Sequence, residues 1–477
     1  MQTENVPLIV DLDRTLAKSD GLFDAFLTTA LKRPKDLPSV VKALFQGRYA
    51  FKAKLAELGA FRPQSMPLRD EFVSYLKTQR DAGRDLHLVT ASPQCVADAV
   101  AARVGIFSTA SGSKEGVNLK GPKKADYLQE HFPDGFTYAG NDASDIEVWR
   151  YARGIVMVGT PKPVERAALK LGVPVEKTFS DPAVSWATWF RMLRVHQWSK
   201  NLLMFVPLAL AHRYNDPSAV ANVALAFVCM GLVASATYII NDLSDLEADR
   251  LHRTKKNRPL ASAAISATSG AATGFVLGGI GMACALLLDM WFAGYLLAYV
   301  VLTLAYSLRL KSIALLDVFV LGLLYTLRIV MGIVLLRAPA SPWLLVFSLF
   351  FFFSLSMAKR HVEIVRALDR GETGRIKGRG YNTSDAPLSL SLGISSSAIA
   401  VMLLFLYVAN DAFPAGAYQH PQWLWATSPL VFLWVTRIWL KSHRGKLDDD
   451  PINFALRDKP SLLLGVLVAI CFAMATL

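Results

Sequence analysis

The spacing of apolar residues divides the chain into two parts. Up to about residue 190, apolar runs of a few residues alternate with charged stretches, as in a soluble α/β domain. From about Trp198 onward, much longer apolar runs alternate with short polar loops. A helix needs roughly 20 apolar residues to cross the hydrocarbon core of a bilayer. The second part is therefore predicted to be an all-helical membrane domain.

Nine runs in this second part are long and apolar enough to be spans. They lie near residues 200–214, 219–240, 269–289, 291–308, 314–336, 342–358, 389–409, 424–440 and 461–477. Lysine and arginine cluster after the second, fourth, sixth and eighth runs, whereas the other loops hold only Arg213 and Arg337. Because cytoplasmic loops carry the excess of basic residues, we expect these four loops to be cytoplasmic.

This topology predicts the location of both ends of the chain. The soluble part precedes the first span, so it lies on the cytoplasmic side, and an odd number of spans sends the C-terminus to the opposite side. Residues 6–10 are too short an apolar run for a signal-peptide core, which agrees with a cytoplasmic N-terminus. We expect a multi-pass protein of a bacterial-type cytoplasmic membrane.

Charge and cysteine content narrow the possible partners. The net charge is +13, and its basic residues cluster at the ends of apolar runs, which favours a bilayer surface over nucleic acid as the partner. The four cysteines, Cys95, Cys229, Cys284 and Cys471, show no spacing typical of a metal site or a disulfide.

An acid-rich motif, Asn241-Asp242-x-x-Asp245-x-x-x-Asp249, follows the second span. In a helix its three aspartates would share one face, where they repel one another unless a cation neutralises them. Their oxygen atoms suit Mg²⁺, and Lys255 and Arg258 follow as donors for phosphate oxygens. The alternative is a solvated acidic helix end before an ordinary basic loop. The position of the acids at the membrane interface favours a functional role.

With this motif and nine spans, residues 190–477 resemble the UbiA-type intramembrane prenyltransferase superfamily. Lys200 and Asn201 before the first span, and Tyr306, Lys311 and Asp317 around the fifth, support the resemblance. It implies a nine-helix transmembrane bundle that binds Mg²⁺ and a diphosphate.

One segment departs from the usual family pattern. Ordinary members carry a second aspartate motif, DxxxD, between the sixth and seventh spans, but here the segment contains Lys359, Arg360 and Glu363. This exchange of acid for base resembles the branch of decaprenyl-phosphate phosphoribosyltransferases. That branch joins a polyprenyl phosphate to 5-phosphoribosyl 1-diphosphate (PRPP), a pair of substrates that is richer in phosphate than a prenyl diphosphate with an aromatic acceptor.

The resemblance implies a role for each residue. Asp242, Asp245 and Asp249 would hold Mg²⁺ on the leaving diphosphate. Substrate phosphates and the ribose would contact Lys200, Asn241, Lys255, Arg258, Tyr306, Lys311, Lys359 and Arg360. Glu363 is either a metal ligand or the partner of Lys359. Arg328, a charge within the fifth span, is either functional or a buried partner of Asp317.

The soluble part shows the pattern of a doubly wound sheet. Short buried strands are predicted at residues 6–10, 86–89 and 137–139, and each ends in polar residues. The carboxyl ends of parallel strands meet at one edge, so these polar groups should converge there. The first group is Asp11-Leu-Asp13-Arg-Thr15, whose two aspartates suit a nucleophile and a nearby acid/base.

This DxDxT motif makes residues 5–175 resemble the haloacid dehalogenase (HAD) phosphatase superfamily. The resemblance implies Asp11 as the nucleophile, Asp13 as the acid/base, and Thr90 and Lys124 as phosphate-binding groups, with Lys120 as a rival to Lys124. Asp11, Asp13, Asn141 and Asp145 would hold Mg²⁺. Asn141 replaces the aspartate that is usual in the family, and an amide oxygen ligates Mg²⁺ without adding charge. Residues 21–67 would form a small helical cap.

These patterns predict three segments: an α/β HAD-like (Rossmannoid) domain at 1–175, a connector at 176–197 and a UbiA-like bundle at 198–477. In the connector, Trp186, Trp189 and Phe190 suit a helix lying in the membrane interface.

Together the segments predict a bifunctional membrane enzyme with one Mg²⁺ in each domain. It would make polyprenylphosphoryl-phosphoribose and then remove the 5-phosphate, on a route to arabinose donors for the cell envelope. One alternative is a conventional prenyltransferase with an aromatic acceptor. Another is a transporter or lipid-binding scaffold with a regulatory HAD domain. The sequence leaves a homo-oligomer open.

Overall fold

The structure is a computed structural model that describes residues 6–114, 117–376, 378–413, 416, 418–447, 454–455 and 457–477. These residues form two compact units. The first contains Met1–Leu193 and Tyr238–Gly274, and the second contains Arg194–Thr237 and Phe275–Leu477. The acid-rich segment, residues 241–258, therefore belongs to the same unit as the N-terminal sheet.

Six parallel strands form the sheet of the first unit, in the order β3-β2-β1-β4-β5-β6. They are β1 (Leu8–Val10), β2 (Leu86–Pro93), β3 (Thr109–Ser113), β4 (Thr137–Gly140), β5 (Gly154–Val158) and β6 (Val175–Phe179). β1 lies inside the sheet and pairs with both β2 and β4. β2 and β3 extend the sheet on one side of β1, and β4, β5 and β6 extend it on the other side. Polar residues that follow these three strands lie at a topological switch point, where doubly wound folds bind ligands.

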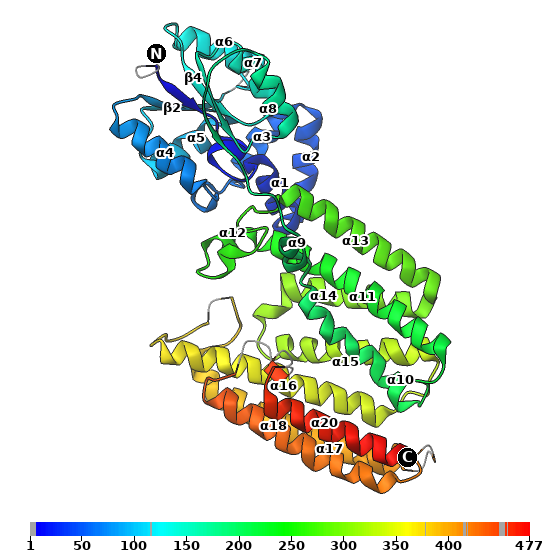
Figure 1. Ribbon diagram of the computed structural model, residues 1–477. Helices are drawn as coiled ribbons and strands as arrows, with labels where there is room; N and C mark the ends of the chain where they lie inside the picture. The colour runs from blue at the N-terminus through cyan, green and yellow to red at the C-terminus, as the bar shows by residue number, and fades with distance from the viewer. Residues whose placement is uncertain are drawn as a thin grey trace. The chain divides into compact units, whose positions relative to one another are not determined.

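Helices cover both faces of the sheet (Figure 1). Successive strand residues point to opposite faces. Leu8 and Val10 accordingly pack with α4 (Asp70–Asp81) and α5 (Gln94–Val104), whereas Ile9 packs toward the opposite layer. That layer consists of α6 (Pro122–His131), α7 (Ile146–Trp149) and α8 (Lys162–Leu169). The expected doubly wound α/β domain is confirmed.

The expected helical cap lies between β1 and β2 in the chain. It consists of α1 (Gly21–Lys32), η2 (Pro34–Asp36), α2 (Leu37–Phe45), α3 (Arg48–Glu57) and η3 (Pro63–Ser65). Asp20 begins α1, because its carboxylate accepts hydrogen bonds from the backbone N–H groups of Leu22 and Phe23, at 3.1 Å each.

The segment that leaves the sheet begins later than residue 175, because β6 continues to Phe179. It leads to α9 (Trp186–Leu193), on which Trp186 and Phe190 are 80% and 55% exposed. Exposed aromatic residues of this kind suit a membrane interface, and this placement of α9 stays a prediction.

The remaining helices belong to the second unit or to the part of the first unit between Tyr238 and Gly274. In chain order they are η5 (Val195–Phe205), α10 (Val206–Leu210), α11 (Pro217–Ser244), α12 (Leu246–Leu251), η6 (Lys255–Asn257), α13 (Ala267–Leu288), α14 (Met290–Leu308), η7 (Leu310–Ser312), α15 (Leu316–Leu336), α16 (Pro342–Asp369), η8 (Thr383–Asp385), α17 (Ala386–Tyr407), η9 (Val408–Ala412), η10 (Pro421–Ala426), α18 (Thr427–His443) and α20 (Lys459–Thr476).

Within the described part of the chain, seven helical stretches are long and apolar enough to cross a membrane. They correspond to α11, α13, α14, α15, α16, the stretch Thr383–Ala412 and α20. Of the other two expected spans, residues 200–214 contain the short helices η5 and α10, and residues 424–440 contain α18, which has 17 residues. A multi-pass helical unit is confirmed, and the count of nine spans stays a prediction.

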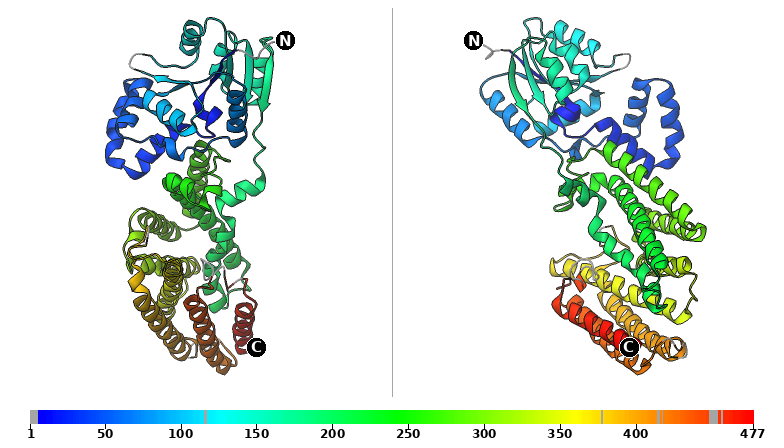
Figure 2. Two further views of the ribbon diagram at one scale, coloured as in Figure 1. Left: turned by 90° about the vertical axis from the view of Figure 1, so that its left-hand side faces the viewer. Right: turned by 45° about the vertical axis from the view of Figure 1, so that its right-hand side comes forward.

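Close helix contacts fix the geometry of the second unit. Trp439 of α18 donates a hydrogen bond from its indole Nε1 to Ser354 Oγ of α16 at 3.0 Å, and Ser354 Oγ donates to the carbonyl of Gly393 on α17 at 2.8 Å. A side chain at Gly393 would overlap the Trp439 ring. These contacts hold α16, α17 and α18 side by side (Figure 2).

Candidate active sites

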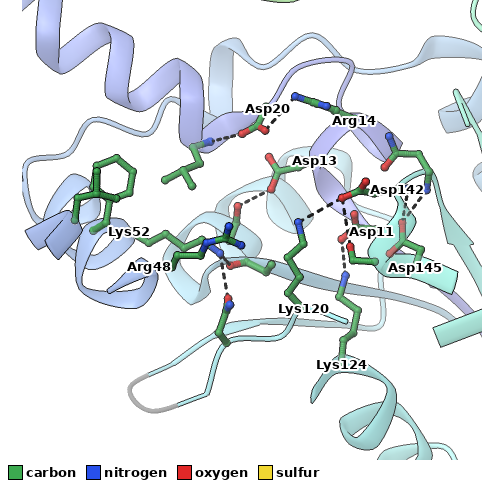
Figure 3. Close-up of a pocket in the computed structure, with 18 residues that line it drawn as sticks. Asp11, Asp13, Arg14, Asp20, Arg48, Lys52, Lys120, Lys124, Asp142 and Asp145 are labelled. Carbon is green, nitrogen blue, oxygen red and sulfur yellow. Dashed lines mark hydrogen bonds and ion pairs between the residues drawn. The ribbon is translucent and has the colours of Figure 1, made fainter. Parts of the chain in front are cut away.

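The nucleophile expected in the HAD-like domain lies at the carboxyl end of β1. Asp11 begins the tight turn η1 (Leu12–Leu16), and its backbone N–H donates to the carbonyl of Ala139 at the end of β4. Lys124 Nζ of α6 donates to Asp11 Oδ1 at 2.7 Å (Figure 3). It also donates to the hydroxyl of Tyr138 at 2.9 Å. The side chain of Lys124 is 4% exposed, whereas that of Lys120 is 43% exposed and pairs with Asp142 at 3.3 Å. The geometry therefore favours Lys124 over its rival.

Asp13 is held by two donors from different elements. Its Oδ1 accepts from the backbone N–H of Gly21, and its Oδ2 accepts from Ser92 Oγ, both at 2.8 Å. A Cβ atom at Gly21 would lie 2.7 Å from Met66 Cε and 3.1 Å from Asp13 Oδ1, so a larger residue there would have to displace the end of the Met66 side chain. Burial and then the neighbouring Asp20 raise the pKa of Asp13. A carboxyl that keeps its proton to higher pH suits an acid catalyst.

Thr90, which we expected to bind phosphate, is fully buried within β2, three residues before the strand ends. Its hydroxyl oxygen accepts a hydrogen bond from the backbone N–H of Ser92 at 3.1 Å. Among the described residues that line the cavity, Ser92 is present and Thr90 is not. Ser92, which follows Thr90 by two positions and was not predicted from the sequence, thus lines the cavity. Phosphate binding by Thr90 stays a prediction.

The loop after β4 holds the remaining acids. Asp145 Oδ2 accepts from the backbone N–H groups of Asn141 and Asp142 at 2.8 Å each, and its Oδ1 accepts from the Tyr138 hydroxyl at 3.0 Å. Asn141 Oδ1 accepts from the Thr15 hydroxyl at 3.2 Å. Burial, followed by the charge of Asp11, raises the pKa of Asp145.

The donor set of this site fits Mg²⁺. Asp11, Asn141 and Asp145 supply oxygen atoms, and the two buried carboxylates repel each other in a way that a cation relieves. Among the described residues, no group of three or more His, Cys, Asp and Glu side chains is placed to hold a metal ion. The fit to Mg²⁺ thus rests on the chemistry of the oxygen donors, including the amide oxygen of Asn141.

The acid-rich segment breaks the single helix that its spacing predicted. Helix α11 ends at Ser244 and α12 begins at Leu246, so Asp245 lies between them. Asp242 and Asp249 nevertheless converge, because Arg258 Nη1 lies 3.0 Å from Asp242 Oδ1 and 2.5 Å from Asp249 Oδ2. Lys255 Nζ lies 3.8 Å from Asp249 Oδ1.

This arrangement also fits a cation. Asp242 and Asp249 are 6% and 2% exposed, and burial raises the pKa of Asp249 while Arg258 opposes that rise. Carboxylate oxygens are the donors that Mg²⁺ prefers, so the chemistry of these two side chains suits that ion. Arg258, which we expected on a phosphate, instead bridges the two acids here.

The same segment is bound to the cap within the first unit, a contact that nothing in the sequence predicted. Arg250 Nη2 of α12 lies 2.8 Å from Asp24 Oδ2 of α1, and both side chains are largely buried. Arg62 Nε lies 3.0 Å from Glu247 Oε1. An apolar cluster accompanies the ion pairs, formed by residues of α1, α9, α11 and the segment that follows it: Phe23, Leu27, Leu31, Trp189, Met192, Leu243, Leu246 and Leu260.

A buried ion network in the second unit contains two residues that we expected to bind substrate. Arg360 Nε of α16 lies 2.8 Å from Asp317 Oδ2 of α15, and Arg360 also pairs with Glu363. Tyr381 donates its hydroxyl to Asp317 Oδ1 at 2.8 Å, and Arg379 lies 3.3 Å from Glu363. Arg360 is 1% exposed, and its charge is paired with the carboxylates of Asp317 and Glu363. It therefore does not face solvent. Glu363 pairs with Arg360 and Arg379, and Lys359 also acts on its charge. Its two expected roles, as a metal ligand or as the partner of Lys359, stay predictions.

Tyr306 lies beside this network, with its hydroxyl 3.5 Å from Arg360 Nη2. Lys359 and Lys311 are both half-buried. Lys359 directly precedes Arg360 on α16, and Lys311 of η7 lies six residues before Asp317. Asn241, also half-buried, is part of α11 beside Asp242, in the first unit.

Arg328 occupies a second buried site in the second unit. It donates to Asn201 Oδ1 at 3.1 Å, to the Tyr299 hydroxyl at 3.1 Å and to the carbonyl of Leu324 at 2.5 Å. Its guanidinium lies over the rings of Tyr299 and Tyr325, and Lys200 Nζ lies 5.7 Å from the Tyr325 ring centre. The alternative that Arg328 pairs with Asp317 is wrong, since Asp317 pairs with Arg360 and Tyr381.

Comparison with family models gives two matches. Residues 202–457 match the UbiA prenyltransferase family, and residues 8–150 match haloacid dehalogenase-like hydrolases.

Individual relatives extend these matches. A Sinorhizobium fredii protein named "Uncharacterized protein y4nM" is 45% identical over 471 residues, which cover 98% of this chain and 91% of that protein. The decaprenyl-phosphate phosphoribosyltransferase of Mycobacterium tuberculosis is 31% identical over 289 residues, or 60% of this chain and 93% of that enzyme. A solved UbiA homolog from Archaeoglobus fulgidus, bound to GPP and Mg²⁺, has 17% identity and a TM-score of 0.46, and covers 60% of this chain and 98% of its own.

The matches account for both parts of the fold, the parallel α/β sheet and the helical membrane unit. They favour an enzyme over a transporter or a lipid-binding scaffold, because both matched families are enzyme families. The chain therefore belongs to the UbiA prenyltransferase family, and it carries a haloacid dehalogenase-like domain at its N-terminus.

Proposed function

We propose that this protein transfers 5-phosphoribose from PRPP to a polyprenyl phosphate of the decaprenyl type, and that its HAD-like domain then removes the 5-phosphate. The transfer releases diphosphate. The final product is polyprenylphosphoryl-ribose, a precursor of the kind used for arabinose donors in cell-envelope assembly.

The observation that carries this proposal is the basic character of the segment around Arg360. Glu363 is held between Arg360 and Arg379, so this acidic side chain is already neutralised. Further cations in the segment, including Lys359, Arg366 and Arg375, outnumber the acids. Such a segment suits a donor that brings an additional phosphate group, as PRPP does. The relatives named decaprenyl-phosphate phosphoribosyltransferase support the same substrates.

In the proposed transfer, a phosphate oxygen of the lipid attacks the anomeric carbon of PRPP. The bond from that carbon to the diphosphate oxygen breaks, and diphosphate leaves. Because the lipid phosphate is already anionic, the step requires no strong base. Lys255, Arg258 and Lys311 would neutralise the charge that develops on the leaving group. Lys359 would bind the lipid phosphate or the 5-phosphate, with Lys200, Asn241 and Tyr306 contacting the substrates.

In the proposed dephosphorylation, an Asp11 oxygen attacks phosphorus and the bond to the ribose 5-oxygen breaks. Asp13 gives its proton to that oxygen, which the raised pKa of Asp13 supports. Water then cleaves the aspartyl-phosphate, and Asp13 takes a proton from that water. Lys124 holds Asp11 and the transferring phosphoryl group in place, from its position 2.7 Å from Asp11 Oδ1.

Both sites would use Mg²⁺. Asp242, Asp245 and Asp249 would hold one ion, and Asp11, Asn141 and Asp145, together with Asp13, would hold another. When bound, the ion supplies positive charge that stabilises the phosphate oxygens.

We place both proposed sites on the cytoplasmic side of a bacterial-type cytoplasmic membrane, with the C-terminus on the opposite side. The basic loops after the second, fourth, sixth and eighth expected spans support this orientation. PRPP is a water-soluble substrate, so a cytoplasmic site would receive it directly.

The test uses the purified full-length protein with PRPP, Mg²⁺ and decaprenyl phosphate in detergent. We expect lipid-linked ribose and both diphosphate and inorganic phosphate as products. Asp11→Asn should accumulate the 5-phosphorylated lipid, while Asp245→Asn should abolish transfer and still dephosphorylate that lipid when it is supplied. Asp134→Asn, an exposed aspartate outside the cavity, is the matched control.

Two results would contradict the proposal. Turnover of a prenyl diphosphate with an aromatic acid, without turnover of PRPP, would assign the protein to conventional prenyl transfer. Inability of the wild-type protein to release phosphate from the lipid-linked phosphoribose would remove the second activity.

A further inference from the structure

The cavity at Asp11 is larger than a phosphate group requires. Its volume is about 450 Å³, within the range of pockets that hold organic ligands. One part of its wall comes from the ends of β1, β2 and β4 and contains Asp11, Asp13 and Asp145. The other part comes from the cap, and the function of that part is not explained by the phosphoryl transfer.

Two cap cations, Arg48 and Lys52 of α3, line this second part (Figure 3). Lys52 is 8% exposed, and its Nζ donates to the carbonyl of Ala91 at 2.6 Å and to Asn118 Oδ1 at 3.1 Å. An ammonium group has three N–H donors, so one remains for a ligand. Among the described residues, neither Arg48 nor Lys52 forms an ion pair with a carboxylate.

The other cations of the cavity differ in this respect. Lys124 pairs with Asp11, Lys120 pairs with Asp142, and Arg14 pairs with Asp20. A buried charge is costly unless an opposite charge accompanies it. Lys52, which is buried, and Arg48, which is exposed, are referred to below as the cation pair. Asp13 and Asp20 of the same cavity act on the charge of Lys52, but among the described residues neither member of the pair is taken up by an ion pair.

Apolar side chains lie beside the cation pair. Leu22, Leu44 and Phe51 line the same part of the cavity, and Leu44 is 49% exposed. The cap wall therefore combines two cations with an apolar border that opens to solvent. This combination complements a substrate in which an anionic group is joined to a hydrocarbon chain.

We infer that the cation pair is a second anion subsite, so that the HAD-like domain selects a phosphate monoester that carries a second phosphate group at its other end. The monoester lies at Asp11 and Lys124, and the second phosphate lies at Arg48 and Lys52. The first part of a hydrocarbon chain attached to that second phosphate passes over Leu22, Leu44 and Phe51. This inference rests on the proposed function and gives the substrate class of its second step.

The experiment measures binding rather than turnover. The full-length protein carries Asp11→Asn, so that bound phosphate esters are not hydrolysed, and Asp245→Asn, so that the proposed transferase site is disabled. Isothermal titration in Mg²⁺ compares ribose 5-phosphate with ribose 1,5-bisphosphate. We expect the bisphosphate to bind about tenfold more tightly, as one additional charge-assisted contact would give.

Single substitutions in that protein assign the preference to the cation pair. Arg48→Ala should remove most of it, whereas Lys42→Ala, an exposed lysine of α2 outside the cavity, should leave it unchanged. Lys52→Met repeats the test at the buried member. Equal binding of the two esters, or a preference that Arg48→Ala does not reduce, would overturn the inference.

A third ligand tests the apolar border. Farnesylphosphoryl-ribose 5-phosphate should bind more tightly than ribose 1,5-bisphosphate, and Leu44→Ser should remove that gain while Val41→Ser should not. If the farnesylated ligand binds no more tightly than ribose 1,5-bisphosphate, or if Leu44→Ser leaves its tighter binding unchanged, the proposed contact of the hydrocarbon chain with the apolar border is overturned. Failure of the proposed function is distinguishable, because it is measured as absent phosphate release by the wild-type protein, whereas these affinities are measured without turnover.

Discussion

The two acid-rich sites hold their carboxylates in different ways. In the HAD-like domain, Asp11 is fixed by Lys124, Asp13 by two donors, and Asp145 by three. Most of these donors belong to strand ends or to the loops that directly follow them. Asp242 at the end of α11 and Asp249 of α12 are instead bridged by one guanidinium, that of Arg258, which lies on a loop.

This difference has a functional meaning. Carboxylates fixed by several short hydrogen bonds are preorganised, so little rearrangement is needed when a phosphate binds. In the acid-rich segment the Arg258 side chain joins Asp242 to Asp249, and Lys255 also lies beside Asp249. Since Arg258 is also a candidate phosphate ligand, it would have to release the acids when Mg²⁺ and a diphosphate bind. We therefore expect activity at the HAD-like site to fall mainly when a catalytic side chain is replaced. Activity at the acid-rich segment should fall when Arg258 is replaced.

Lys124→Met should have the largest effect of the substitutions considered. It removes the cation that contacts Asp11 and should lower the rate of phosphate release by about 10²- to 10³-fold. Lys120→Met should lower that rate by less than about tenfold, because an exposed ion pair contributes little. The rates are measured as inorganic phosphate released from the 5-phosphorylated lipid. If Lys120→Met lowers the rate of phosphate release more than Lys124→Met does, Lys120 is the phosphate-binding lysine and Lys124 is not.

Arg258→Ala should affect transfer and spare dephosphorylation. It leaves Asp242 and Asp249 buried without their shared partner, and we expect the rate of transfer from PRPP to fall by about 100-fold. Arg253→Ala, an exposed arginine of the same loop, is the matched control. Phosphate release from supplied lipid should change less than about twofold in both proteins. If Arg258→Ala and Arg253→Ala transfer at similar rates, Arg258 has no special role.

The sequence predicted the parts of both sites that are contiguous in the chain. The order of polar residues after β1, β2 and β4 follows from short buried strands, and DxDxT places Asp11 and Asp13 on one turn. The acid-rich motif was recognisable because its aspartates lie within nine positions of the chain. Local spacing carries this information, since neighbouring residues stay close in any fold.

Contacts between distant residues were not predictable in this way. Arg360, Asp317 and Tyr381 come from three separate elements, and no local pattern indicates that they meet. The alternative that Arg328 pairs with Asp317 was wrong for a different reason. Both residues lie on α15, eleven positions apart, and this separation places them about 16 Å apart along the helix axis. Lys52 was missed, although it interrupts the buried face of α3 formed by Phe51 and Leu55. A lysine within an apolar face was the available signal.

Tyr381→Phe should lower the stability of the second unit without altering the acid-rich segment. The hydroxyl donates to Asp317 at 2.8 Å and accepts from the backbone N–H of Leu315 at 2.9 Å. Burial and then Asp317 raise the pKa of Tyr381, so the hydroxyl keeps its proton at neutral pH. Loss of such a bond costs about 2 kcal/mol. The melting temperature in detergent should fall by a few degrees, whereas Tyr214→Phe, at a half-exposed ring, should leave it unchanged.

The smallest effect is expected where the cap meets the acid-rich segment. Asp24 and Arg250 form a largely buried pair, whereas Arg62 and Glu247 are about one-third exposed. A double-mutant cycle with alanine should give a coupling energy of about 1 kcal/mol for the first pair and about 0.5 kcal/mol for the second. The free energy of unfolding is followed in urea as loss of phosphatase activity by the full-length protein. Zero coupling between Asp24 and Arg250 would mean that the cap does not depend on this segment, and the two acid-rich sites would then be mechanically independent. A measured coupling would instead make the segment that holds Asp242 and Asp249 part of the support of the phosphatase cap.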